Sequence, residues 1–288
     1  IGTVILFVIF YFVKSLFLLF LVAAQAGYYN GLQQSITEQL FGSYLKRPYT
    51  FHLQNNSAKL LSNTITESMQ FAVGFTSSAL LVINDLLIII AILAVLMFAQ
   101  PVGAMMGLIV FGVSSLIIFK MSKNRSALFG ITRQKKERER IKSVQQGFGG
   151  IKDIKLSGRE DIFKRSYADE THGSLEAGRK QTILQNIPKI FLEFVAVCSL
   201  CALVVFVTLS DDTANMVAII GLFAAAAFKL LPTVARLVQS SQAMVFTRPV
   251  VSFMYTELVE NKNLYSSNKS RLSAESDVSF LKNINISN

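Results

Sequence analysis

The chain has 288 residues, of which 52% are apolar and only 16% are charged, and its mean hydropathy is +0.46. Soluble domains carry about 25% charged residues, so this composition excludes an ordinary soluble protein, and 23 phenylalanines exclude intrinsic disorder. Two cysteines are too few for a disulfide scaffold, and 28 Lys and Arg against 18 Asp and Glu indicate a polytopic membrane protein with a basic side.

Five stretches are long and apolar enough to cross a bilayer, which takes about 20 residues in a helix. None shows the period-2 alternation of a barrel strand, so each predicts a helix. The predicted spans are residues 1–27, 76–99, 102–119, 187–209 and 214–235. The predicted fold class is therefore an all-α membrane protein.

The distribution of positive charge assigns the two sides of the membrane. Residues 120–189 carry 17 of the 28 Lys and Arg, whereas the connections 100–101 and 210–213 carry none. Because Lys and Arg are concentrated in cytoplasmic loops, we expect the long connections 28–75 and 120–186 to lie on the cytoplasmic side of a cell membrane. The C-terminus then lies in the cytoplasm and residue 1 outside.

The first residue is Ile rather than Met. We therefore expect the chain to be a fragment of a longer protein. An outer N-terminus without a translocation signal predicts that an earlier span precedes residue 1.

The two long connections have the pattern of helices that continue out of the membrane. In the second connection, apolar residues recur at spacings of 3 and 4, which places them on one helical face; they are Ile141, Val144, Phe148, Ile151 and Ile154. Half of a segment of about 60 residues would reach on the order of 40 Å at 1.5 Å per residue. We expect each connection to form a helical stalk that turns and returns.

Local chemistry predicts where each stalk turns. In the first, Pro48 ends the helix and Asn56 or Ser57 caps the next one. In the second, Gly158 breaks the helix and a short amphipathic turn follows over 159–167. Periodicity alone is equally consistent with an ordinary solvated helix-turn-helix tip.

Four motifs resemble the transmembrane domain of type I ATP-binding cassette (ABC) exporters, and among these the bacterial lipid-linked oligosaccharide flippases. They are FVKSLF at 12–17, YLKRPY at 44–49, NSAKL at 56–60 and GIKDIKLSGRE at 150–160. The resemblance covers nearly the whole chain. It implies a helical bundle with long cytoplasmic extensions.

The resemblance implies that each stalk tip is a coupling helix, and that the second one docks on a nucleotide-binding domain, often that of the partner subunit. The first would contain Pro48, Tyr49, Phe51, His52 and Leu53. The second would contain Arg159, Glu160, Asp161, Phe163 and Tyr167. The same resemblance implies a homodimer in which the third and fourth spans cross to the other subunit.

The sequence contains no G-x-x-x-x-G-K-[ST] phosphate loop. We therefore predict no catalytic residue in this chain, and we expect ATP and Mg²⁺ to be cofactors of a nucleotide-binding domain outside it. The transmembrane domain is predicted over 1–260, with a serine-rich linker over 261–276. Residues 277–288 resemble the first strands of a cassette ATPase.

Four charges inside the spans are candidates for a substrate cavity, because a charge at the bilayer centre costs about 2.5–3.5 kcal/mol. Lys229 and Arg236 are seven residues apart, within about 20° of one helical face. They could bind a phosphate or pyrophosphate head group, or they could snorkel to the inner interface. Lys14 and Asp85 could each face the cavity or pair with a neighbour.

No metal site and no nucleic-acid partner are predicted. Cys198 and Cys201 form a C-x-x-C pair inside an apolar helix, where small side chains favour helix packing. The basic stretch 120–189 also carries eight acidic residues, which argues against a nucleic-acid surface. Attraction to anionic lipid explains its charge better.

The sequence thus predicts the transmembrane part of an ATP-driven exporter or flippase. It would move a lipid-linked oligosaccharide, or a similar amphipathic substrate, by alternating access. Export of a lipid, peptide or drug is the alternative within this class. A helical channel or scaffold that does not use ATP is the alternative from another class.

Overall fold

A computed structural model describes residues 2–99, 101–209 and 216–260, and within these ranges every element is helical and there is no strand. The α-helices are α1 (Gly2–Leu45), α2 (Tyr49–Gln54), α3 (Ser57–Ser62), α4 (Thr76–Ala99), α5 (Pro101–Gly149), α6 (Ile151–Ser157), α7 (Glu160–Leu209) and α8 (Met216–Tyr255). Three π-helical segments are η1 (Asn63–Glu67), η2 (Gln70–Phe75) and η3 (Thr256–Glu260). The predicted linker 261–276 and the segment 277–288 lie outside the described residues.

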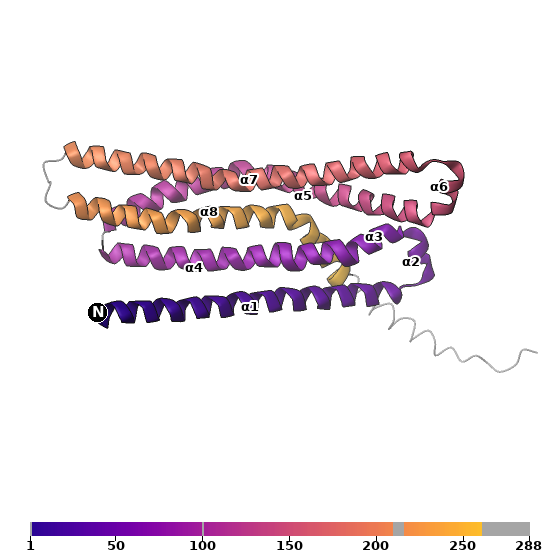
Figure 1. The fold of residues 1–288 in the computed structure, drawn as a ribbon, viewed down its shortest axis with the longest axis horizontal. Coiled ribbons are helices and arrows are strands. Elements are labelled where there is room, and N and C mark those ends of the chain that lie inside the picture. The colour runs from indigo at the N-terminus through magenta and orange to yellow at the C-terminus, as the bar shows by residue number, and fades with distance from the viewer. Residues whose placement is uncertain (1, 100, 210–215, 261–288) are drawn as a thin grey trace, which may run out of the picture.

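The long helices run side by side in an elongated bundle, with the N-terminus at one end and α2 and α6 at the other (Figure 1). Four helical segments in the described part are long and apolar enough to cross a membrane; they are Gly2–Leu45, Ser57–Phe98, Gly107–Gly149 and Glu160–Ala202. They contain the cores of the first four predicted spans. The fifth, 214–235, begins outside the described residues and continues into α8, which starts at Met216. The all-α membrane fold is confirmed.

The helices α5 and α7 are much longer than a membrane is thick. They have 49 and 50 residues, and a helix of that length extends about 75 Å, against roughly 30 Å for the hydrocarbon core. More than half of each helix therefore lies beyond the apolar segment. Together with α6 they form a hairpin, here called the second stalk.

The first stalk contains the second half of α1 together with α2, α3, η1 and η2. The chain turns at Pro48, whose φ of −62° and ψ of 155° place it before α2 rather than within a helix. At the start of α3, the Asn56 side chain accepts a hydrogen bond of 2.8 Å from the Ala58 amide. The predicted proline break and asparagine cap are both present.

The second stalk turns at α6, which is bounded by Gly150 and Gly158. Gly158 has a φ of 63°, a left-handed conformation that glycine adopts without a Cβ penalty. The predicted short turn over 159–167 is instead the start of the uninterrupted helix α7. Glu160 and Asp161 in its first turn favour helix initiation there, since their charges complement the helix dipole.

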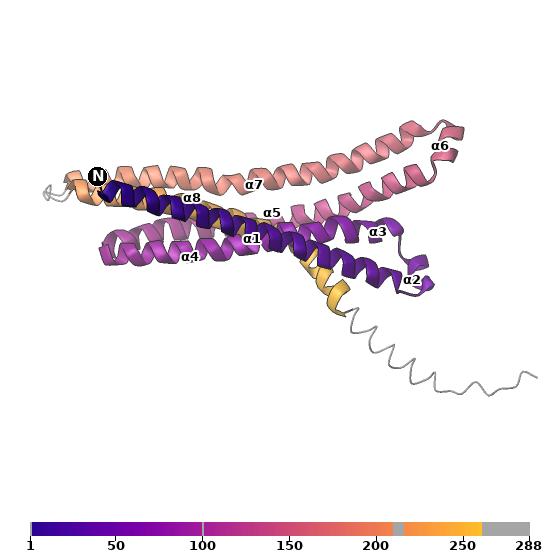
Figure 2. The same ribbon diagram turned by 60° about the horizontal axis from the view of Figure 1, so that its bottom comes forward.

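The two stalks separate toward their tips, as Figure 2 shows for α2 and α6. The end of α8 belongs with the first stalk, where Val250 and Met254 pack against Ile36, Leu40 and Tyr44 of α1. Nearer the N-terminal end, a second buried cluster joins α5, α7 and α8; it contains Phe111, Leu192, Val234 and Ala235. The helix α8 therefore connects the membrane bundle with the first stalk.

Candidate functional site

Two of the predicted cavity charges form an ion pair between α4 and α8. The Arg236 Nε donates to both carboxylate oxygens of Asp85 at 2.9 Å, and its Nη2 also donates to Oδ1. The Asp85 side chain is fully buried, whereas 46% of the Arg236 side chain is exposed. Of the two alternatives for Asp85, the structure shows the pairing with a neighbour, which is Arg236.

The prediction for Arg236 changes accordingly. We expected a cation that acts with Lys229, but Asp85 compensates the charge of Arg236 in the structure. A neutral pair attracts an anionic head group less strongly than a free cation does. The side chain of Lys229 lies outside the described part of the structure.

Lys14 lies in the exposed first half of α1, where its ammonium is 5.1 Å from the centroid of the Tyr11 ring. Within the described residues, no ion pair or hydrogen bond links Lys14 to Asp85 or Arg236. Its large apolar neighbours from Val4 to Val22 are also exposed, as expected for a helix that faces lipid or another protein. Among the described candidate charges, the structure therefore does not bring Lys14 to Asp85 or Arg236.

The predicted residues of the first tip divide between two faces of α2. Tyr49 and Leu53 point outward, with exposed fractions of 75% and 68%. Phe51 and His52 face the end of α1, where the Phe51 ring stacks on Tyr44 at 6.2 Å and His52 Nε2 lies 3.1 Å from the Tyr44 carbonyl oxygen. The helix α2 is therefore anchored on one face and presents apolar side chains on the other.

The predicted residues of the second tip are mostly exposed. Arg159, Glu160 and Asp161 face solvent, and Phe163 is half-buried. The pKa of the Glu160 carboxyl is lowered, first by a hydrogen bond from its own backbone amide at the start of α7 and then by the Lys155 ammonium at 3.0 Å. This tip therefore favours the ionised form of Glu160 and also presents exposed apolar side chains, Leu156 and Ile162.

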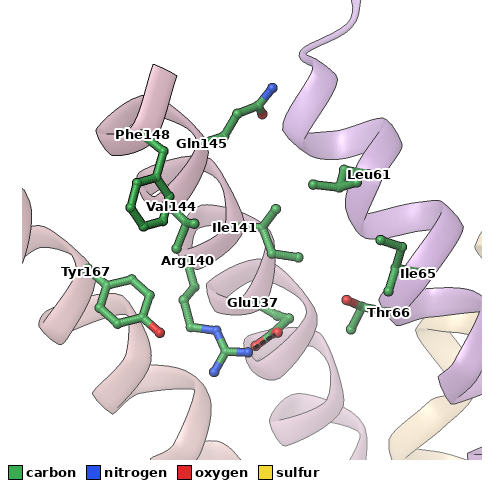
Figure 3. Close-up of a pocket in the computed structure, with 10 residues that line it drawn as sticks. All are labelled: Leu61, Ile65, Thr66, Glu137, Arg140, Ile141, Val144, Gln145, Phe148 and Tyr167. Carbon is green, nitrogen blue, oxygen red and sulfur yellow. Dashed lines mark hydrogen bonds and ion pairs between the residues drawn. The ribbon is translucent and has the colours of Figure 1, made fainter. Parts of the chain in front are cut away.

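An apolar groove of about 420 Å³ separates the two stalks (Figure 3). Leu61 and Ile65 face it from the first stalk, and Val144, Phe148 and Tyr167 line it from the second. An adjoining cavity of about 610 Å³ shares these last three residues and extends toward α6. The sequence could not indicate this space, because it arises from the relative placement of two separate hairpins.

Close in sequence to the groove residues Ile65 and Thr66, a buried carboxylate links the two stalks. Glu67 in η1 is fully buried, and its Oε2 accepts hydrogen bonds of 3.3 Å from Arg133 Nη2 and Gln134 Nε2 of α5. Burial raises the pKa of Glu67, and the positive charges of Arg133 and Arg138 oppose this shift. The sequence pattern did not predict this contact, although Glu67 is the only charged residue between Lys59 and Asp85.

Sequence analysis also missed a second buried ion pair, which joins Arg47 beside Pro48 to Glu257 in η3 at 2.7 Å. Among the described residues, no group of three or more His, Cys, Asp or Glu side chains could hold a metal ion. The buried ion pairs described above each join separate helical segments of the bundle.

A comparison with known families agrees with this architecture. A family model described as the ABC transporter transmembrane region matches residues 1–231. The match covers most of the chain and includes α1 to α7 and the first part of α8. The chain therefore belongs to the ABC transporter transmembrane regions, which lie in a membrane and pair with a nucleotide-binding domain.

Proposed function

We propose that the chain forms the membrane part of an ATP-driven exporter that works by alternating access. The observation that carries this proposal is the pair of long stalks whose tips, α2 and α6, lie at the same end of the bundle (Figure 1). A nucleotide-binding domain outside residues 1–288 would dock on these tips and would itself bind ATP and Mg²⁺. The concentration of Lys and Arg in the second stalk supports a cytoplasmic location of both tips.

The surface of the tips supports their role as docking elements. Tyr49 and Leu53 on α2 are largely exposed, as are Leu156 at 77% and Ile162 at 61% on the second tip. Exposed apolar groups far from the membrane segment favour contact with another protein. The proposed coupling helices are therefore α2 and the segment 159–167 at the start of α7.

The groove between the stalks supports a cycle in which they approach and separate. Its apolar lining gains burial when the stalks close, which favours the closed state by about 25 cal/mol for each Å² of apolar surface removed from water. The Glu67 contact with α5 lies at its base. ATP binding would supply the energy difference between the two arrangements.

We also propose that the transporter is a homodimer, with α5 and α7 crossing to the other subunit. In the single chain, the apolar side chains from Val4 to Val22 of α1 are exposed. A second subunit would cover part of this surface. The proposed membrane is the cell membrane.

The proposed substrate is a lipid-linked oligosaccharide, on the basis of the motif resemblance and the intramembrane charges. Lys229 and the half-exposed Arg236 are the candidate contacts for its phosphate groups. Another lipid, a peptide or a drug is the alternative cargo. The channel or scaffold alternative gains no support from any described feature.

The test uses the full-length protein in proteoliposomes, with ATP hydrolysis measured in the presence and absence of polyprenyl-pyrophosphate glycans. Stimulation by the glycans and inhibition by vanadate are expected. Stimulation by other lipids or peptides alone would reject the proposed substrate, and no vanadate-sensitive hydrolysis at all would reject the ATP-driven class.

A paired variant tests the docking role of α2. Leu53→Asp places a charge on the outer face of α2 and should reduce ATP-dependent transport at least tenfold. Leu175→Asp is the matched control, because Leu175 on α7 is similarly exposed at 63% but lies away from both tips. Equal loss in the two variants would contradict a specific role of the tip.

A further inference from the structure

The junction between α1 and α2 contains a buried arginine that the proposed function does not use. Arg47 precedes Pro48, and only 7% of its side chain is exposed. Its Nη2 donates to Glu257 Oε2 at 2.7 Å, and the Glu257 side chain is 13% exposed. The two residues are 210 positions apart in the sequence, so the contact joins the first stalk to the last described helical segment, η3.

Aromatic rings hold the guanidinium group in place. Its central carbon lies 4.3 Å from the centroid of the Phe51 ring and 5.0 Å from that of Tyr44. Tyr44 belongs to α1 and Phe51 to α2, and the two rings are nearly parallel at 21°. A cation beside aromatic faces is stabilised by their quadrupoles, so Arg47 has attractive contacts with three elements, namely α1, α2 and η3.

The pair lies beside the apolar core of the first stalk. Val250 and Met254 precede η3 in the chain, and they pack with Leu40 and Tyr44 of α1 in one buried cluster. Charges in such surroundings attract each other more strongly than in water, and each depends on the other for compensation. The pKa of Tyr44 is raised to about 12, first by burial and then by the nearby Glu257 charge, which agrees with this compact arrangement.

The position of the pair along the chain gives it mechanical importance. Pro48 and α2 follow Arg47 directly, while the chain continues from η3 into residues 261–288. Apolar packing already brings these parts together, since Phe51 of α2 and Leu258 of η3 both contact the buried cluster of α1 and α8. The Arg47–Glu257 ion pair adds a polar contact between the α1–α2 junction and η3.

We propose that Arg47 is a positioning residue that joins α2 to η3, so that the first stalk tip and the end of α8 move as one body. This inference rests on the proposed function for the role of α2 in docking. The contact itself does not depend on that function. Two experiments separate these parts.

The first experiment measures hydrogen exchange by mass spectrometry on the full-length protein in nanodiscs without nucleotide. We expect Arg47→Gln to accelerate exchange at least tenfold in both 49–54 and 256–260. Arg47→Lys retains the charge and should restore most of the protection. Lys46→Gln is the matched control, since Lys46 is the exposed neighbour and should leave both segments unchanged.

The inference is overturned if Arg47→Gln accelerates exchange in 49–54 alone and leaves 256–260 protected. It is also overturned if Arg47→Lys behaves like Arg47→Gln, because a charge contact would then not explain the coupling. If Arg47→Gln does not fold, Glu257→Gln provides the same comparison from the other side of the pair.

The second experiment measures the change in exchange that MgATP and vanadate produce in the stalk segment 57–75. Arg47→Gln should decrease both this exchange change and the rate of ATP hydrolysis relative to wild type. We expect the factor for the exchange change to be at least five times the factor for hydrolysis, because a positioning residue affects the transmission of motion more than the chemistry. An equal proportional loss of the exchange change and of ATP hydrolysis would show that Arg47 only stabilises the fold, and it would overturn the positioning role. A wild-type protein without hydrolysis or response would refute the proposed function, while the first experiment would still decide whether Arg47 joins α2 and η3.

Discussion

Replacing Asp85 and replacing Arg236 should lower the stability of the protein by different amounts. Removing one member of a buried ion pair costs about 3–5 kcal/mol, because the remaining charge loses its compensation. Asp85 is fully buried, but 46% of the Arg236 side chain is exposed. Arg236→Ala leaves a buried carboxylate, whereas Asp85→Ala leaves an arginine that can turn toward water or lipid head groups.

We therefore expect Arg236→Ala to lower the free energy of unfolding by about 3–5 kcal/mol, and Asp85→Ala by only about 1 kcal/mol. The double variant Asp85→Ala/Arg236→Ala should be more stable than Arg236→Ala alone, because it has no unpaired carboxylate. Asn84→Ala is the control, since Asn84 is the exposed neighbour of Asp85.

The assay is reversible unfolding by SDS in mixed micelles, followed by circular dichroism and analysed as a double-mutant cycle. Equal costs for the two single variants would refute the argument from unequal burial. Additive costs in the double variant would show that the two side chains do not interact in the folded protein.

Three further changes test the packing of the stalks. Gly130→Ala should lower stability by about 1–3 kcal/mol in the same assay, because its Cβ would collide with the Phe246 carbonyl oxygen, whereas Gly178→Ala has no neighbour within 4 Å and should be neutral or stabilising. Burial raises the pKa of Glu67 above its ordinary value of 4.5, so the folded protein favours the protonated form. The free energy of unfolding should therefore fall as the pH rises from 4.5 through the raised pKa. Glu67→Gln should flatten this pH dependence, and an unchanged pH profile in the variant would contradict the role of Glu67. Gly158→Ala should cost about 1–2 kcal/mol at its positive φ, seen as faster hydrogen exchange in 151–157, and an unchanged rate would argue against the left-handed turn.

The features that sequence analysis predicted correctly depend on local chemistry. Pro48 lacks an amide hydrogen and ends α1 within a few residues of its position. Gly158 adopts the left-handed conformation that ends α6. Runs of apolar residues identified the membrane segments for the same reason, since hydrophobicity and length suffice to recognise a span.

The features that sequence analysis missed depend on contacts between distant residues. Asp85 and Arg236 are 151 positions apart, and Arg47 and Glu257 are 210 apart. Hydrophobic periodicity gives the face of a helix but not the helix that packs against it. The same limit explains why the sequence did not indicate that Arg236, a candidate for head-group binding or for snorkelling, pairs with Asp85 on α4.

The start of α7 shows a different limit. A glycine followed by charged and aromatic residues was interpreted as a break and a separate short turn over 159–167. The sequence after Gly158 has no further helix-breaking residue before Gly173, and two acidic residues stabilise the new helix from its first turn. The long helix therefore begins at the tip itself.

The most direct test of the account is the distance between the two stalk tips within one subunit of the full-length protein. Spin labels at positions 46 and 169 replace two exposed side chains near the tips but outside the proposed docking surface, and an excess of unlabelled protein restricts the measured pairs to one chain. Pulsed electron paramagnetic resonance should show a shift of the distance distribution when MgATP and vanadate are added. An unchanged distribution in a protein that hydrolyses ATP would contradict the proposal that the stalks transmit the energy of ATP to the membrane bundle.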